Sequence, residues 1–159
     1  MSGDGEGPTG PSVGVGGVLI HQGRVLLIKR GKEPLRGRWV VPGGTVELGE
    51  SLEEALVREM EEETALHVRP GEMLTVFDRI ERTDGHVRYH YVIVDYLCEY
   101  VAGEARAASD ALEVAWAAPG ELVLFDLPAK ALEVVEEAFR RSSARRGLPT
   151  APGDPILLK

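Results

Sequence analysis

The chain has a single cysteine and no long run of apolar residues. Cys98 has no partner within the chain, so an intramolecular disulfide is excluded, and we expect a reduced core residue, as in cytoplasmic proteins. No apolar run approaches the roughly 20 residues of a membrane-spanning helix. The opening segment is rich in glycine rather than in apolar residues, and its first basic residue is Arg24, so no secretory leader is predicted.

Basic residues are also in the minority. The 18 lysines and arginines stand against 26 aspartates and glutamates, which gives a formal net charge of −8 at pH 7. Such a surface repels polyanions, so neither nucleic acid nor an anionic membrane is expected as a partner. A length of 159 residues is enough for one domain with a proper core.

The two ends of the chain differ in composition from its middle. Residues 1–12 are rich in glycine and proline and are predicted to be a disordered tail, and residues 147–159 to be a second tail or arm. One domain remains at residues 13–146. Its patterns predict strands and two helices, and hence an α/β sandwich with a mixed sheet. The expected strands are residues 13–20, 24–30, 39–41, 73–79, 87–101 and 113–117, and the expected helices are residues 52–64 and 128–141.

The stretch from Gly44 to Leu66 carries most of the net charge. It contains eight glutamates and one basic residue, Arg58, so its formal charge is −7, against −8 for the whole chain. A folded domain rarely gathers its charge in one short element without a counter-charge, and bound divalent cations are the obvious candidate. The eight are Glu47, Glu50, Glu53, Glu54, Glu59, Glu61, Glu62 and Glu63.

Helical spacing separates these glutamates into two groups. Glu59, Glu62 and Glu63 fall on one face of the expected helix, at positions i, i+3 and i+4. The earlier residues of that face are apolar, so it should pack inward. Buried carboxylates repel one another unless a cation lies among them, and hard oxygen ligands suit magnesium or manganese. The apolar residues of this face are Leu52, Ala55 and Leu56, whereas Glu53, Glu54 and Glu61 point the other way.

This stretch resembles the signature of the Nudix hydrolases: Gly, five residues, Glu, seven residues, then Arg-Glu-apolar-any-Glu-Glu-any-Gly-apolar. Here it begins at Gly44 and ends at Leu66, and every position matches except Ala65, which stands where the family has glycine. Trp39 and Pro42-Gly43 also resemble the usual lead-in. The resemblance implies the family's α/β/α sandwich with a mixed sheet.

The resemblance also implies a reaction, in which water attacks a phosphorus of a nucleoside diphosphate linked to a further group. Both the substrate and the glutamates are anionic, so a metal ion is required, and Mg²⁺ is expected, with Mn²⁺ as a possible substitute. By resemblance the metal ligands are Glu59, Glu62 and Glu63, with Glu62 also counted as catalytic. The backbone carbonyl of Gly43 is an expected extra ligand, because adjacent glycines let the loop fold back against the helix.

Arg58 and Glu50 resemble the orienting ion pair of the family and are counted as catalytic. An ordinary helix pairing of Arg58 with Glu54 or Glu62 is the alternative. Glu47 either reaches the metal through water or is a surface residue.

The general base of such enzymes usually lies outside the signature, before the last strand. Asp110 is the first candidate, and Glu113 and Glu104 are the others. The alternative for Asp110 is a turn residue beside Ser109.

Recognition of the nucleoside is left open by the sequence. Aromatic residues are available for stacking on a base and arginines for binding phosphates, but each group has a structural alternative in the core or on the surface. The aromatic candidates are Trp39, Phe77, Tyr89 and Tyr91, and the arginines are Arg79, Arg82 and Arg88.

The region from Tyr89 to Cys98 and residues 110–116 resemble the ADP-ribose pyrophosphatase-like branch, which converts ADP-ribose to AMP and ribose 5-phosphate. That branch often has a proline about fifteen residues after the signature, and residues 80–83 contain none. A nucleoside-triphosphate pyrophosphatase that removes oxidised nucleotides is the enzymatic alternative. A non-catalytic nucleotide-sensing module is an alternative of another class. Family habit and the end segments suggest a homodimer.

The ends of the signature helix are also predicted. Ser51 is the expected N-cap, and Glu54 completes a capping box. Ala65 is expected just after the helix in a left-handed conformation that alanine resists, because Thr64 is a weak helix former and Leu66 begins an extended run.

Overall fold

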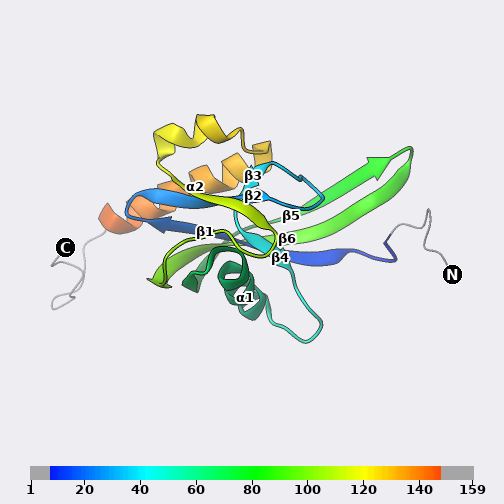
Figure 1. The fold of residues 1–159 in the computed structure, drawn as a ribbon, viewed down its shortest axis with the longest axis horizontal. Coiled ribbons are helices and arrows are strands. Elements are labelled where there is room, and N and C mark those ends of the chain that lie inside the picture. Colours follow the sequence, from blue (N-terminus) through cyan, green and yellow to red (C-terminus); the bar gives the residue numbers. More distant parts are fainter. Residues whose placement is uncertain (1–7, 148–159) are drawn as a thin grey trace.

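A computed structural model describes residues 8–147 of the chain. Its seven-stranded mixed sheet lies between α1 (Leu52–Thr64) and α2 (Ala129–Gly147), which cover opposite faces (Figure 1). The predicted α/β/α sandwich is therefore confirmed. The strands are β1 (Ser12–His21), β2 (Arg24–Arg30), β3 (Trp39–Val40), β4 (Gly43–Thr45), β5 (His67–Thr83), β6 (His86–Ala102) and β7 (Ala111–Ala117).

Strand β1 organises the sheet. The main order is β3-β2-β1-β6-β5, while β4 pairs with β1 and β7 pairs with β2. The β1–β6 pair is parallel and the other pairs are antiparallel. Because β1 pairs with β4 on one edge and β6 on the other, it brings the loop before α1 close to the middle of β6.

The core has two halves, one on each face of the sheet. Side chains of successive strand residues point to opposite faces, so Leu26 packs under α1 and Leu27 under α2. The first half includes Leu56 and Met60 of α1, and the second includes Val135 of α2. Cys98 is a free, buried residue of the first half, as predicted for a core cysteine.

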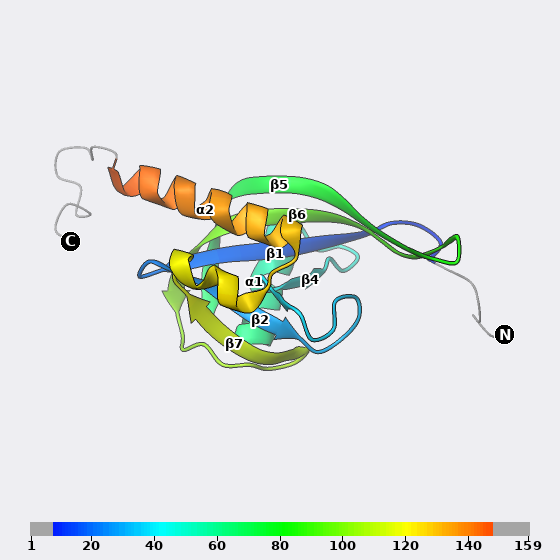
Figure 2. The ribbon, with the colours of Figure 1, turned by 90° about the horizontal axis from the view of Figure 1, so that it is seen from above.

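Two tight turns follow the sequence signals. Gln22 and Gly23 both have positive φ, 53° and 77°, in the turn between β1 and β2. Asp84 and Gly85, with φ of 52° and 79°, join β5 to β6. Positive φ at both central residues is typical of two-residue hairpin turns, which match the twist of the strands. The β5–β6 hairpin projects beyond the rest of the sheet (Figure 2).

Strand β5 begins six residues earlier than expected, at His67 instead of Met73. Pro70 and Gly71 suggested a break, but β5 is the edge strand of the main sheet order, and its pairing with β6 is irregular between Pro70 and Met73. An edge strand with a bulge accommodates a proline, since no ladder hydrogen bond is required there.

The C-terminal half holds two further differences. A 3-10 helix, η1 (Pro119–Phe125), was not expected, because seven residues give too short a pattern to recognise. Helix α2 ends at Gly147 instead of Arg141; its last six residues carry no apolar stripe from which the sequence could predict them as helical. The predicted tails fall mostly outside the described residues, apart from residues 8–12 and 147.

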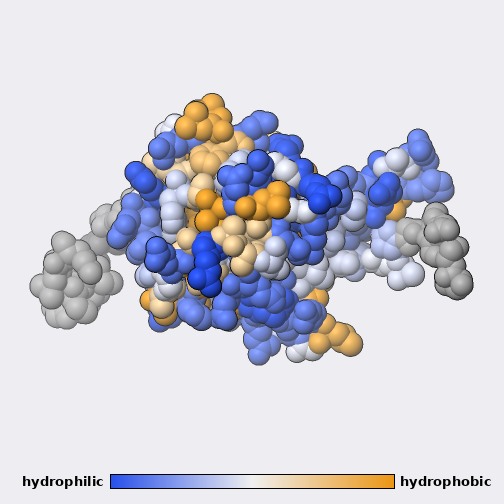
Figure 3. All heavy atoms as spheres, viewed as in Figure 1, coloured by the Kyte–Doolittle hydropathy of each residue, from blue (hydrophilic) through white to orange (hydrophobic). Residues whose placement is uncertain are grey.

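Most of the surface in Figure 3 is hydrophilic, and its apolar side chains lie in small separate groups. Val123 and Leu124 of η1 and Leu48 of the loop before α1 are the most exposed large apolar residues. Among residues 8–147, no helix has the length and apolar character needed to span a membrane.

The ends of α1 agree with the prediction. The Ser51 hydroxyl accepts a hydrogen bond from the Glu54 N–H at 3.1 Å, and the Glu54 carboxylate accepts one from the Ser51 N–H at 2.8 Å. Ala65 has φ 64° and ψ 13°, and its N–H still donates to the Glu61 carbonyl. The alanine is thus held in the left-handed region, where its Cβ is unfavourable.

We predict that Ala65→Gly raises the melting temperature, because glycine adopts the left-handed conformation without strain. Relief of about 1 kcal/mol corresponds to a rise of about 2–4 °C in a chain of this size. Differential scanning calorimetry measures it. The matched control is Ala55→Gly inside α1, which should lower the melting temperature. A fall for Ala65→Gly would contradict the strain argument.

Candidate functional site

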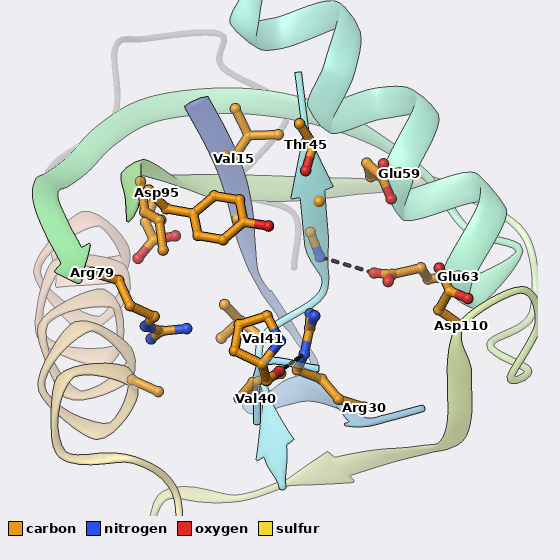
Figure 4. A pocket seen from close by; sticks show the side chains of 18 of the residues that line it. Val15, Arg30, Val40, Val41, Thr45, Glu59, Glu63, Arg79, Asp95 and Asp110 are labelled. Atoms are coloured by element: carbon orange, nitrogen blue, oxygen red, sulfur yellow. Dashed lines mark hydrogen bonds between the residues drawn. The ribbon is translucent and has the colours of Figure 1, made fainter. Parts of the chain in front are cut away.

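An open cavity of about 140 Å³ lies where α1, β4, β1, the end of β2 and the middle of β6 meet. Figure 4 shows acidic side chains of α1 on one side and Arg79 and Asp95 on the other. The charged residues of the lining are Arg30, Lys32, Glu59, Glu63, Arg79, Asp95 and Asp110. The cavity therefore has anionic and cationic groups within reach of a single ligand.

Glu63 is the most deeply buried acidic group of α1, with 4% of its surface exposed. Its Oε1 accepts a hydrogen bond of 2.9 Å from the backbone N–H of Gly43 (Figure 4). Burial raises the pKa of this carboxyl from its ordinary value of 4.5 to about 7, and the Gly43 N–H and the nearby Arg30 oppose that rise. Gly43 must be glycine, because a Cβ there would overlap the carbonyl oxygen of Val15 on β1.

Glu59 lies one turn earlier and has 15% of its side chain exposed. A Cβ on Gly44 would overlap the carboxylate of Glu59, so the bare backbone of β4 makes room for this group. Burial raises the pKa of Glu59, while its hydrogen bond from Arg58 lowers it. Two adjacent glycines thus admit two carboxylates to the same side of the cavity.

Arg58 forms a two-point ion pair with Glu50. Its Nε lies 2.6 Å from one carboxylate oxygen and its Nη2 lies 2.9 Å from the other. The hydrogen bonds from Arg58 lower the pKa of Glu50 to about 2. Nη1 also lies 2.9 Å from Glu59 and 3.2 Å from Glu62, so both the Glu50 pairing and the Glu62 alternative are present. Glu54 instead caps the helix.

The expectation of three inward carboxylates is correct for two of them. The side chain of Glu62 is 46% exposed, turns toward Arg58 at the rim and does not line the cavity. Within residues 8–147, no three His, Cys, Asp or Glu side chains converge as a ready-made metal site. A residue three positions after Glu59 lies about 60° around the helix, which is enough to place it on the rim. Glu47, with 68% of its side chain exposed, is also a surface residue.

Asp110 lines the cavity beside Glu63 (Figure 4). Its Oδ2 lies 3.0 Å from Lys32 Nζ, and its backbone carbonyl accepts a hydrogen bond of 2.7 Å from the Gly31 N–H. Ser109, with φ 53°, lies in the turn directly before Asp110, whose side chain is 49% exposed. Of the three acidic candidates, Asp110 alone reaches the cavity.

The other two candidates lie elsewhere. Glu113 pairs with Lys29 on the outer surface of β2 and β7, at 3.4 Å, and does not line the cavity. Glu104 is an exposed residue of the segment before β7 and does not line it either.

Only some of the residues considered for nucleoside recognition lie on the wall of the cavity opposite α1. Phe77 and Arg79 of β5 and Tyr91 of β6 line the cavity. Trp39 instead packs edge-on against Phe125, with ring centroids 5.1 Å apart. Tyr89, Arg82 and Arg88 do not line it.

Three charged lining residues were not singled out from the sequence: Arg30, Lys32 and Asp95. Arg30 ends β2, and its Nε donates to the Pro34 carbonyl at 2.7 Å. The basic run from Lys29 to Lys32 at the end of a strand was a usable signal for the first two. No feature of the sequence pointed to Asp95, because its position at the cavity depends on the parallel pairing of β6 with β1.

The donor set fits a divalent cation. Glu59 and Glu63 supply buried hard oxygen ligands, and the charge of Glu59 raises the cost of ionising Glu63. Arg58 and Lys32 partly offset the cost at Glu59, and the Gly43 N–H and Arg30 partly offset it at Glu63. The geometry can also hold a water near Asp110 and an anion near Arg30 and Arg79. Such an arrangement suits metal-assisted hydrolysis of a phosphate ester or anhydride.

Comparison with known proteins points the same way. The family model described as NUDIX domain matches residues 9–138. The ADP-ribose pyrophosphatase of Methanocaldococcus jannaschii is 38% identical over 103 residues, which are 65% of this chain but only 59% of that protein. The human 8-oxo-dGDP phosphatase is 46% identical over 61 residues, 38% of this chain and 19% of that protein. The chain thus spans less than two thirds of either relative.

A solved structure resembles the chain over more of its length. The crystal structure of a MutT NUDIX hydrolase from Burkholderia pseudomallei is 32% identical and has a TM-score of 0.69. The match covers 80% of this chain and 98% of that one.

We predict that Glu63→Gln stabilises the metal-free protein much more at pH 8 than at pH 5. The folded pKa of about 7 lies above the ordinary value of 4.5, so the stability contributed by Glu63 is present below about pH 4.5 and is lost as the pH rises through 7. Glutamine does not ionise, so the variant does not lose this stability as the pH rises. Melting temperatures in excess chelator test this, with Glu53→Gln on the outer face as control. An equal effect of Glu63→Gln at both pH values would contradict the burial argument.

Proposed function

We propose, since this chain belongs to the NUDIX family, that it hydrolyses a phosphoanhydride bond of a nucleoside diphosphate linked to another group. The observation that carries the proposal is the pair of buried carboxylates, Glu59 and Glu63, held against the bare backbone of Gly43 and Gly44 beside Asp110. Buried carboxylates this close are costly in the absence of a cation and useful in its presence.

Mg²⁺ is the proposed cation, with Mn²⁺ as a substitute. Glu59 and Glu63 are its proposed ligands, together with the carbonyl of Gly43 and with Glu62, whose side chain must leave Arg58 to take part. When bound, the cation neutralises phosphate oxygens and lowers the pKa of the attacking water. The exposed position of Glu62 leaves it free to turn, since its contacts with Arg58 are long, at 3.2 and 3.3 Å.

The remaining residues have separable roles. Asp110 is the proposed general base, because it lies in the cavity beside Glu63 and its charge is supported by Lys32. Arg58 holds Glu59 in place and is itself fixed by Glu50. On this proposal, Arg58 and Glu50 position the ligands and do not touch the substrate.

The cationic side chains of the wall suit the phosphates. Arg79 makes no ion pair in the described part of the chain, and burial together with the nearby charge of Arg30 lowers its pKa. A guanidinium that is partly desolvated and unpaired is a good site for a phosphate oxygen. Arg30 and Lys32 lie on the same cavity and add to the positive potential.

ADP-ribose is the first proposed substrate, supported by the similarity to the methanogen pyrophosphatase. An oxidised nucleoside di- or triphosphate is the second, supported by the similarity to the human phosphatase. A non-catalytic sensing role is disfavoured by the complete set of signature glutamates. The cytoplasmic location and the homodimer remain predictions, the latter to be measured by light scattering.

We predict that Glu63→Gln folds and loses activity by about a hundredfold or more, because a neutral amide is a poor ligand for a hard cation. Glu62→Gln should also lose much of its activity, which distinguishes a ligand at the rim from a surface residue. The control is Glu61→Gln, whose side chain pairs with His67 on the outer face. Hydrolysis rates measured with added Mg²⁺ decide the matter. Full turnover in excess chelator would refute the metal role.

We predict that ADP-ribose yields AMP and ribose 5-phosphate and that triphosphates are poor substrates. Chromatography of the products from ADP-ribose, dinucleotides, nucleotide sugars and oxidised triphosphates measures this. Faster release of pyrophosphate from a triphosphate than of AMP from ADP-ribose would favour the second substrate.

A further inference from the structure

Asp95 of β6 is buried, with 4% of its surface exposed, and lines the cavity on the wall opposite α1 (Figure 4). Its carboxylate accepts no hydrogen bond and forms no ion pair among the residues that the structure describes. The charges of Arg79 and Lys130 lower the pKa of Asp95, but neither residue forms an ion pair with it. Gly16 of β1 faces it, and a Cβ on Gly16 would overlap Asp95 Oδ1.

The buried carboxyl of Asp95 lowers the stability of the folded protein. Burial raises the pKa of Asp95 from 3.8 to about 6, and an unpartnered buried carboxyl lowers the stability of the free protein. The proposed hydrolysis does not use it, because the metal ligands and Asp110 lie on the other side of the cavity. An acceptor kept without a partner in the protein, yet facing a cavity, is available to a ligand.

The surroundings of Asp95 suit a flat ring. Phe77 and Tyr91 provide aromatic surfaces, and apolar side chains complete this end of the cavity. The cavity opens to solvent, so this end can hold one ring while the rest of the substrate extends toward the acidic wall. The apolar residues are Val40, Val41, Ile93 and Ala131.

We propose that Asp95 is a specificity-determining residue that accepts a hydrogen bond from an N–H group of the substrate's nucleobase, which packs against Phe77 and Tyr91. This inference rests on the proposed function of the same site. A phosphate is excluded at Asp95 by charge repulsion. A ribose hydroxyl is also a donor, but a sugar does not exploit two aromatic rings and an apolar wall as a base does.

The test compares substrates that differ only in the amino group of the base. The pairs are ADP-ribose with its analogue in which hydrogen replaces the 6-amino group of adenine, and GTP with ITP, which lacks the 2-amino group. For the pair that wild type turns over, loss of the amino group should reduce kcat/KM by about 10- to 100-fold, because the buried carboxylate is left unpaired.

Asp95→Leu has nearly the same shape and no acceptor, so it should turn over both members of the pair at rates within about threefold. Asp95→Asn keeps one acceptor oxygen, folds if the leucine variant does not, and should reduce the discrimination at least severalfold. The matched control is Asp78→Asn on the exposed part of β5, which should discriminate as wild type does.

A second measurement separates recognition from a structural role. In the metal-free protein, Asp95→Asn should melt at the same or a higher temperature than wild type, because a costly unpaired charge is removed. A clear fall would assign Asp95 to stability and overturn the proposal.

If no substrate is hydrolysed, calorimetry can compare the affinities for AMP and purine riboside 5′-monophosphate, and for GMP and IMP. Each pair differs only in the amino group of the base. Absence of hydrolysis would refute the proposed function alone. Equal affinities and rates for both members of every pair, or discrimination that persists in Asp95→Leu, would overturn the role of Asp95. The proposal would also be overturned if Asp95→Leu changed only the discrimination between substrates that differ in a ribose hydroxyl.

Discussion

Close approach of two glycines to two glutamates is the constraint on which this site depends. β4 pairs with β1 so tightly that Gly43 has no room for a Cβ, and its N–H is thereby aimed at Glu63. The neighbouring Gly44 leaves room for the carboxylate of Glu59. Any larger residue at either position would separate helix from strand or push a carboxylate out of the cavity. The position of α1 on the sheet is therefore fixed by the same contacts that bring its acidic groups inward.

Arg58 neutralises the acidic groups near the rim of the cavity more than those deeper in it. Arg58 contacts Glu50, Glu59 and Glu62 and so compensates the groups near the rim. It does not reach Glu63, whose carboxylate accepts a hydrogen bond only from the Gly43 N–H within residues 8–147. Negative charge that the protein does not neutralise is thus left at the deepest point of the acidic wall, where a divalent cation would neutralise it most effectively.

Several residues of the molecule lower its stability at or near the site. Glu63 and Asp95 are buried acids with raised pKa values, and Ala65 holds a left-handed conformation directly after the helix. The first two face the cavity, where a ligand can compensate the cost, whereas nothing in the site requires an alanine at position 65. The stability lost at Glu63 and Asp95 is therefore linked to ligand binding, whereas the strain at Ala65 has no role in the site.

The sequence by itself determined the features that depend on near neighbours in the chain. The capping box at Ser51, the inward positions of Glu59 and Glu63 and the turn at Asp84 follow from local spacing and from dihedral preferences, which act over a few residues. Tertiary structure decided the rest. Asp95 joins the site only because β6 pairs in parallel with β1, and Arg79 only because β5 pairs with β6. A rotation of about 60° around the helix separates Glu62 from Glu59, and only packing shows that this places Glu62 at the rim. A cavity is made by strands far apart in sequence, so its opposite wall leaves no periodic trace in the chain.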